Sequence, residues 1–149
     1  MDQTSNDTAD TARLDDFICF AIYSANHALN RVYKPLLDAV GLTYTQYIAM
    51  VTLWERDDQT VGSLGEKLFL ESSTLTPVLK RLEGLGLIAR TRDKTDERQV
   101  RVQLTAKGRA LQEQARTIPP CILEASGLET DELARLKAEI ATLRSSLLR

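Results

Sequence analysis

Hydrophobic residues recur every three to four positions after the polar N-terminus, which is the pattern of one buried face of an α-helix. The run LDDFICFAIYSANHALNRVY, from Leu14 to Tyr33, carries this spacing, and the helix is expected to end near Gly41 with Pro35 as a kink. Its apolar positions are Leu14, Phe17, Ile18, Ala21, Ile22, Ala25, Ala28, Leu29 and Val32.

Three further helices follow at short intervals. Thr43 is the expected N-cap of an apolar helix, TYTQYIAMVTLWE, which DDQT ends, and GSLGEKLFL predicts a short helix after it. The next periodic run is LTPVLKRLEGLG. Because proline suits only the first turn of a helix, Pro77 predicts a start near Ser73 or Thr74, with a cap from Ser72, Ser73 or Thr74.

After Gly84 and Gly86 the hydrophobic period changes from helical to alternating. LIARTRD and QVRVQLT predict two short strands, and the charged DKTDER between them predicts the tip of a β-hairpin. Thr105 then caps the helix AKGRALQEQARTI, which Pro119 and Pro120 interrupt. The last segment carries a seam for packing against another helix, formed by Leu133, Leu136, Ile140, Leu143 and Leu147.

Two short helices joined by a tight turn and followed by a two-stranded wing predict a winged helix-turn-helix. The expected fold class is therefore mainly α with a small β wing. We expect a disordered tail over residues 1–12 and a single domain over 13–149, with residues 60–109 as the DNA-binding part. The apolar helices at 13–40 and 110–149 exceed what so small a module needs, and they predict a homodimer that reads a palindromic site.

The charge distribution agrees with a nucleic-acid partner. Between residues 60 and 109, ten Lys and Arg side chains stand against six Asp and Glu side chains, although the whole chain has a net charge of −2. A basic segment within an acidic protein predicts a polyanionic partner for that segment alone. No apolar run is long enough for a membrane span, and the polar start MDQTSNDTADTA does not resemble a signal peptide. A cytoplasmic protein without a membrane partner is expected.

The second helix of the predicted pair is expected to place its N-terminal end in the DNA major groove. Its candidate contacts are short hydroxyl side chains in the first turns and two cations farther along, which are Ser72, Ser73, Thr74, Thr76, Lys80 and Arg81. The alternative is that the hydroxyls serve only as helix caps. On the wing, Arg98 is the candidate for a minor-groove or phosphate contact, with Asp96 holding its guanidinium. A solvated charged turn is the alternative there.

Three segments carry a family resemblance, and they are GLTYTQYIAM, LFLESSTLTPVLKRLEGLGLI and DERQVRVQLTAKG. Over nearly the whole chain after the tail, the sequence resembles the MarR family of dimeric winged-helix regulators. CFAIYSANHALNRVYKPLL narrows the resemblance to the organic-hydroperoxide-responsive repressors, usually called OhrR. This resemblance implies that Cys19 is the peroxide-reactive cysteine and that Tyr33 and Tyr44 hydrogen-bond its sulfur. Some members carry a second, resolving cysteine near the last helix, which implies that role for Cys121.

The residues around Cys19 leave packing and chemistry both open, because a lone cysteine on an apolar helix is usually packed. A reactive thiol among apolar side chains needs hydrogen-bond donors that prefer the thiolate, and tyrosine hydroxyls are the donors available. Tyr33 lies 14 positions farther along the same helix, about 21 Å away at 1.5 Å per residue. Only the Tyr33 of a second subunit, on an antiparallel helix, can therefore reach the sulfur.

The predicted function is a repressor that binds operator DNA as a reduced dimer and is released when an organic hydroperoxide oxidises Cys19. The first alternative is a regulator released by a non-covalent apolar or phenolic ligand, with Cys19 merely packed. The second is a thiol peroxidase, which leaves the basic wing unexplained, so no enzyme activity is predicted. No cofactor and no metal ion are expected, because the chain has no CxxC motif and His27 is its only histidine.

Overall fold

The computed structural model describes residues 12–149, and residues 1–11, which hold almost all of the predicted tail, lie outside the described part. A 3-10 turn at Leu14–Asp16 precedes the first helix. The elements that follow are α1 (Ile18–Val40), α2 (Tyr44–Glu55), β1 (Gln59–Thr60), α3 (Val61–Leu68), α4 (Ser72–Gly84), β2 (Ile88–Arg92), β3 (Val100–Leu104), α5 (Ala106–Ala115), α6 (Ile118–Ser126) and α7 (Thr130–Leu147).

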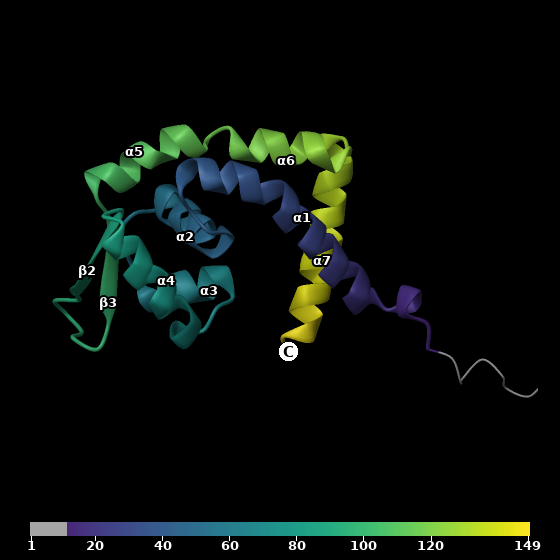
Figure 1. The fold of residues 1–149 in the computed structure, drawn as a ribbon. Helices are drawn as coiled ribbons and strands as arrows, with labels where there is room; N and C mark the ends of the chain where they lie inside the picture. The colour runs from purple at the N-terminus through teal and green to yellow at the C-terminus, as the bar shows by residue number, and fades with distance from the viewer. Residues whose placement is uncertain (1–11) are drawn as a thin grey trace, which may run out of the picture.

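The elements form a winged module with long helices on one side of it. Figure 1 shows α5 and α6 running along α1, with α2, α3 and α4 below them and the β2–β3 hairpin at one end. Helix α7 turns down at the opposite end, away from the hairpin. The predicted fold class, mainly α with a small β wing, is confirmed. Among the described residues, no helix is both long and apolar enough to cross a bilayer.

Local capping chemistry sets several helix ends where the sequence predicts them. The Thr43 hydroxyl accepts from the Gln46 backbone N–H at 3.2 Å, and the Gln46 side chain accepts from the Thr43 N–H at 3.0 Å, which completes a capping box. Thr105 caps α5 by accepting from the Gly108 N–H at 3.0 Å. Gly41 ends α1 with φ +74°, a conformation that glycine adopts without strain.

Two predicted helix starts are wrong. The first helix begins at Ile18, not at Leu14, because the preceding residues form the 3-10 turn and Phe17 is extended. Helix α4 begins at Ser72, earlier than predicted, and its N-cap is Glu71, which makes no side-chain capping bond. Pro77 therefore lies inside α4 and not in its first turn.

The wing is a three-stranded sheet in the order β1-β3-β2, with antiparallel pairing throughout. The predicted hairpin is confirmed by a register that runs from Ile88 opposite Leu104 to Arg92 opposite Val100. Strand β1 was not predicted, because DDQT reads as a simple break after α2. Its two residues pair with β3, Gln59 opposite Val102 and Thr60 opposite Arg101. Strand β1 is therefore one edge strand of the sheet, and it directly precedes α3.

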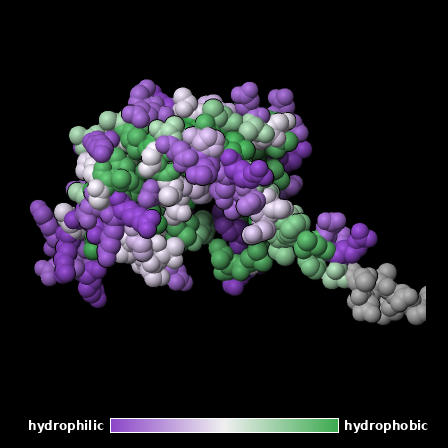
Figure 2. Space-filling view, in the orientation of Figure 1, coloured by the Kyte–Doolittle hydropathy of each residue, from purple (hydrophilic) through white to green (hydrophobic). Residues whose placement is uncertain are grey.

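Most of the hydrophobic core lies in α2, α3, α4 and the wing, and the long helices contribute Leu37, Ala115 and Ile118 to it. Its most deeply buried side chains are Met50, Leu53, Leu64, Leu75, Leu79, Leu82, Ile88, Ile118 and Val102. In α1 only Leu37 is buried, and α7 contains no buried residue. The apolar residues at the start of α1 are uncovered in the single chain, as Figure 2 shows at the end next to the grey residues. Burying one such side chain is favourable by about 1.5–3 kcal/mol, so this face favours a partner.

Candidate redox site and nucleic-acid interface

Cys19 is the second residue of α1 and is exposed in the single chain. Its neighbours Phe17 and Ile18 are also exposed, at 42% and 64% of their surface. The sequence pattern predicts a buried face at these positions, and no other part of the described chain covers them. The apolar setting expected for the thiol is therefore not provided by the single subunit.

Tyr33 and Tyr44 come together although they lie on different helices. Their ring centroids are 5.1 Å apart and meet edge to face, and Tyr47 approaches Tyr33 with a centroid distance of 6.2 Å. The turn at Gly41 makes this possible, because it folds the start of α2 back onto the last part of α1. Sequence reasoning missed Tyr47, although its spacing of three from Tyr44 places both residues on one side of α2.

The environment keeps the hydroxyl of Tyr33 protonated. Burial, together with the proximity of Tyr44 and Tyr47, raises the pKa of Tyr33 to about 12. Burial also raises the pKa of Tyr47. A phenol in this state donates a hydrogen bond throughout the range of pH in which thiols titrate, and a thiolate is an acceptor that such a donor favours.

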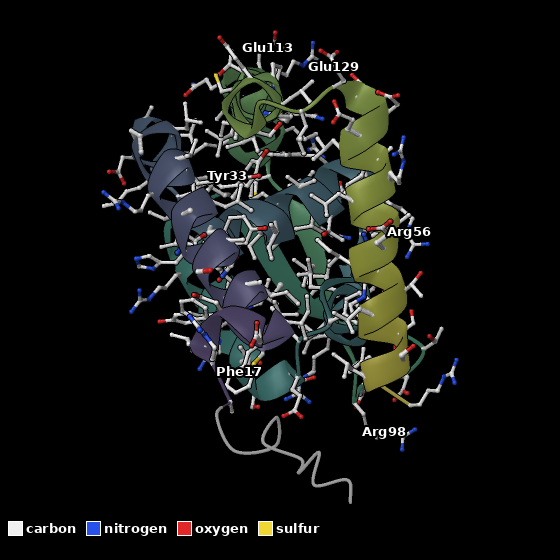
Figure 3. All side chains as sticks on the ribbon, turned by 90° about the vertical axis from the view of Figure 1, so that its right-hand side faces the viewer. Phe17, Tyr33, Arg56, Arg98, Glu113 and Glu129 are labelled. Carbon is white, nitrogen blue, oxygen red and sulfur yellow. The ribbon has the colours of Figure 1, made fainter. Side chains whose placement is uncertain are left out.

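Cys19 and Tyr33 lie far apart on one unbroken helix. Both belong to α1, which runs continuously from Ile18 to Val40 despite Pro35. Figure 3 shows Phe17, which precedes the helix, well separated from Tyr33 along its length. The structure thus does not bring Cys19 to the two tyrosines of its own chain.

Cys121 lies on α6, which packs along α1, and it is partly buried. Both cysteines are free thiols. Pro119 and Pro120 stand in the first turn of α6, where the missing backbone N–H of proline costs the helix no hydrogen bond. The prediction that they end the preceding helix is wrong, because α5 already ends at Ala115 and Ile118 belongs to α6.

The predicted DNA-contacting residues of α4 lie on its exposed side. Ser72, Ser73 and Thr74 are exposed in the first turn, and none of them caps the helix. The predicted capping alternative is therefore wrong, and these hydroxyls are available. Thr76 instead donates its hydroxyl to the Ser72 carbonyl at 2.7 Å. Lys80 and Arg81 are exposed farther along the helix.

On the wing, Asp96 holds Arg98 as the sequence predicts. The Arg98 Nε lies 3.1 Å from Asp96 Oδ1, and its Nη2 lies 3.4 Å from Oδ2. The side chain of Arg98 is nevertheless 90% exposed, and Figure 3 shows it projecting from the body of the chain. The hydrogen bond from Arg98 lowers the pKa of the Asp96 carboxyl, which keeps the pair ionised.

Comparison with known proteins places this geometry among transcriptional regulators. The family model for the transcriptional regulators SarA/Rot matches residues 31–115. The organic hydroperoxide resistance transcriptional regulator of Bacillus subtilis is 44% identical over 138 residues, covering 93% of this chain and 94% of that protein. The HTH-type transcriptional regulator TtmR of Methylorubrum extorquens is 44% identical over 147 residues, covering 99% of this chain and 74% of that protein.

Solved structures of AbfR, a protein of Staphylococcus epidermidis, have the same fold. Reduced AbfR bound to DNA is 36% identical, with a TM-score of 0.77 over 92% of this chain and 96% of that one. Disulfide-formed AbfR is 38% identical, but its TM-score is 0.61, over 91% of this chain and 90% of that one. The chain belongs to the MarR family of winged-helix transcriptional regulators, in the branch that contains the organic hydroperoxide resistance regulators.

Proposed function

We propose that this regulator represses transcription by binding operator DNA as a reduced dimer, and that oxidation of Cys19 by an organic hydroperoxide releases it. The observation that carries the proposal is the placement of Cys19. It lies exposed on an uncovered apolar face, at the far end of the helix that bears Tyr33. A merely packed cysteine would be expected inside the core of the chain.

A second subunit supplies what the single chain lacks. If two α1 helices cross antiparallel, Cys19 of one subunit meets Tyr33 and Tyr44 of the other, while their apolar faces cover each other. The roughly 21 Å from Cys19 to Tyr33 on an α-helix requires this sharing. The hydroxyl of Tyr33 then serves as a donor that favours the thiolate.

The reaction transfers one oxygen atom from the peroxide to the sulfur. The thiolate attacks the O–O bond of the hydroperoxide, that bond breaks, and the alkoxide takes a proton to leave as an alcohol. Cys19 becomes a sulfenic acid. In the next step the thiol of Cys121 attacks this sulfur, a disulfide forms and water leaves. A small thiol is the alternative partner for this second step.

Oxidation would change DNA binding by changing how the two subunits pack in the dimer interface. Moving α1 and α6 changes the separation of the two winged modules, and half-site spacing depends on that separation. The AbfR structures support a coupling to disulfide formation in a relative. The reduced and overoxidised forms bound to DNA match this chain with TM-scores of 0.77 and 0.76, whereas the disulfide form matches it with 0.61. The present conformation is the more similar to the two DNA-bound forms.

The DNA-binding residues in this proposal are the exposed side chains of α4 and the wing. Ser72, Ser73 and Thr74 enter the major groove, with Thr76 behind them, while Lys80 and Arg81 meet phosphates. Arg98 reaches the minor groove or a phosphate from the tip of the wing, with Asp96 fixing its guanidinium.

The test is DNA binding by the reduced protein before and after an organic hydroperoxide. The probe is a fluorescent duplex recovered from random-sequence DNA by the reduced native protein. We expect stoichiometric cumene hydroperoxide to release the native dimer, whereas Cys19→Ser binds the duplex and stays bound. If Cys19→Ser is released as readily as the native protein, the proposed sensor is wrong.

A second function has one observation in its favour. Tyr47, Val51 and Trp54 of α2 line an open, partly apolar pocket of about 280 Å³, with Ala115 and Pro119 on its other side. An apolar or phenolic ligand bound there would release the regulator without oxidation. This alternative is favoured if such a compound releases DNA from Cys19→Ser while hydroperoxide does not release the native protein.

A further inference from the structure

The link between α2 and α3 contains two aspartates, Asp57 and Asp58, which we call the aspartate joint. Asp58 adopts φ +57°, a left-handed conformation that aspartate and asparagine tolerate better than most residues. The backbone therefore turns sharply at Asp58, directly before β1 pairs with the wing. This turn directs both carboxylates toward β3 and α5.

Arg101 of β3 is fastened to this joint by two short hydrogen bonds. Its Nε lies 2.8 Å from Asp58 Oδ1, and its Nη2 lies 2.8 Å from the Asp58 carbonyl oxygen. On the other side, its Nη1 lies 3.8 Å from an oxygen of Asp93, where the tip of the wing begins. The Arg101 guanidinium therefore contacts both the link between α2 and α3 and the tip of the wing.

Asp57 adds two contacts to the same connection. Its Oδ1 accepts from the backbone N–H of Leu104 in β3 at 2.8 Å, and its Oδ2 lies 3.2 Å from Nη1 of Arg109 in α5. The end of α2 is therefore tied to the last strand of the wing and to the helix that follows it.

Arg98 at the wing tip and Arg101 in β3 have opposite surroundings. Arg98, at the tip, is 90% exposed and, within residues 12–149, is bonded only to Asp96, two residues away. Arg101, near the start of β3, is 32% exposed and lies between Asp58 and Asp93, which compensate its charge. The hydrogen bond from Arg101 also lowers the pKa of Asp58, so the joint stays ionised at neutral pH.

We propose that Asp58 and Arg101 are positioning residues for DNA recognition: they set the angle of the wing so that Arg98 reaches the DNA, and neither of them contacts it. The inference rests on the proposed DNA-binding function. According to this proposal, Arg101 is one cation of the basic segment that does not contact phosphate. Strand β1, which the sequence did not predict, would then attach the wing to the helices by pairing with β3.

The experiment compares salt-dependent binding of full-length reduced variants to the selected duplex. Arg101→Met keeps an unbranched apolar stem and removes the guanidinium, and Asp58→Asn keeps a residue that tolerates φ +57°. The matched control is the ion pair of Arg116 with Glu113 on the surface around α5, at 3.3 Å, through Arg116→Met and Glu113→Gln. Each control changes the net charge as its counterpart does.

We expect Arg101→Met and Asp58→Asn to bind about tenfold more weakly, because both wings of a dimer lose their fixed angle. The slope of log K against log salt should stay at the native value in both. Arg98→Ala should instead reduce that slope by about 0.9 for each phosphate that Arg98 neutralises in the native protein. The double variant should bind no more weakly than the weaker single one, since the two residues act as a unit. A reduced slope in Arg101→Met, or native affinity, overturns the inference.

Hydrogen exchange without DNA separates this inference from the proposed function. We expect amides of residues 93–104 to exchange faster in Arg101→Met than in Arg116→Met. If the reduced native protein selects no duplex, the proposed function is wrong, and faster exchange still supports the role of the joint in ordering the wing. Equal exchange in the two variants overturns the inference, whatever the DNA measurement gives.

Discussion

Tyr33 in the last third of α1 and Tyr44 at the start of α2 meet edge to face, with ring centroids 5.1 Å apart and planes inclined by 62°. The contact holds two phenols on one side of the turn at Gly41, where α2 folds back. In the proposed dimer this pair faces Cys19 of the other subunit, so it decides how easily the thiol ionises and reacts.

Replacing Tyr33 by Phe should slow the oxidation of Cys19 by about tenfold or more, because a hydrogen bond to a charged group is lost. The rate is measured by stopped-flow consumption of the free thiol with cumene hydroperoxide. Mixed dimers of Tyr33→Phe and Cys19→Ser chains provide the control. They contain one complete site if the site is shared, and should react at nearly the native rate per intact thiol. A native rate in the Tyr33→Phe homodimer would show that the phenol is not involved.

The raised pKa of Tyr33 also predicts how stability depends on pH. Its pKa is 10.0 in an unfolded chain and about 12 here, so the unfolded chain loses the phenol proton first as pH rises. The stabilisation is fully present below the unfolded value and is lost as pH rises through the folded one. The free energy of unfolding, measured with urea, should therefore fall more between pH 10 and about pH 12 in the native protein than in Tyr33→Phe. Parallel curves for the two proteins would contradict the shift.

Cys121→Ser should leave the first oxidation step intact and remove its protection. Cys19 should still form a sulfenic acid, detectable with dimedone, and should then proceed to irreversible over-oxidation under excess hydroperoxide. The native protein should give a reductant-sensitive covalent dimer on denaturing gels if the disulfide crosses subunits. Full and reversible sensitivity in Cys121→Ser would instead assign Cys121 to packing and leave a one-cysteine mechanism.

The uncovered start of α1 predicts an obligate dimer. Ile18 is 64% exposed in the single chain, so a charge there costs little unless a partner covers it. Ile18→Glu should shift sedimentation toward the monomer at micromolar concentration, while Ala106→Glu, on an exposed position of α5 outside the predicted dimerisation segments, should not. A native protein that sediments as a stable monomer would contradict the proposed assembly.

Gly108 should be irreplaceable for a steric reason. A Cβ at this position would lie 2.0 Å from the Leu87 carbonyl oxygen and 3.0 Å from its carbon, where α5 packs against the start of the wing. Gly108→Ala should lower the free energy of unfolding by about 1–3 kcal/mol or more, measured by urea denaturation. Gly84→Ala is the control, because its Cβ meets nothing within 4 Å. Equal stability of the two variants would contradict the packing.

The sequence predicts features that depend on a few neighbouring residues. The caps at Thr43 and Thr105 and the hairpin follow from local side-chain chemistry and from the hydrophobic period, and they are confirmed. Helix α4 starts differently because burial of Leu75 and Leu79 holds its first turns without a capping side chain.

Other features depend on distant parts of the chain and leave no local signal. Asp58 and Arg101 lie 43 positions apart, and two aspartates in a row give no indication of such a partner. The meeting of Tyr33 with Tyr44 depends on the angle of the turn at Gly41, which spacing alone does not define. The roles of Cys19 and Cys121 follow from a family resemblance and remain predictions.

If Cys19 is the proposed sensor, the unbroken length of α1, which separates it from Tyr33, makes peroxide sensitivity a property of the pair of subunits. When the proposed dimer dissociates, the Cys19 thiol of each chain loses the phenols of the other subunit that favour its ionised form. The response of the regulator to oxidant therefore depends on its own abundance in the cell. As its concentration falls below the dissociation constant of the dimer, the protein loses its sensitivity together with its hold on the operator.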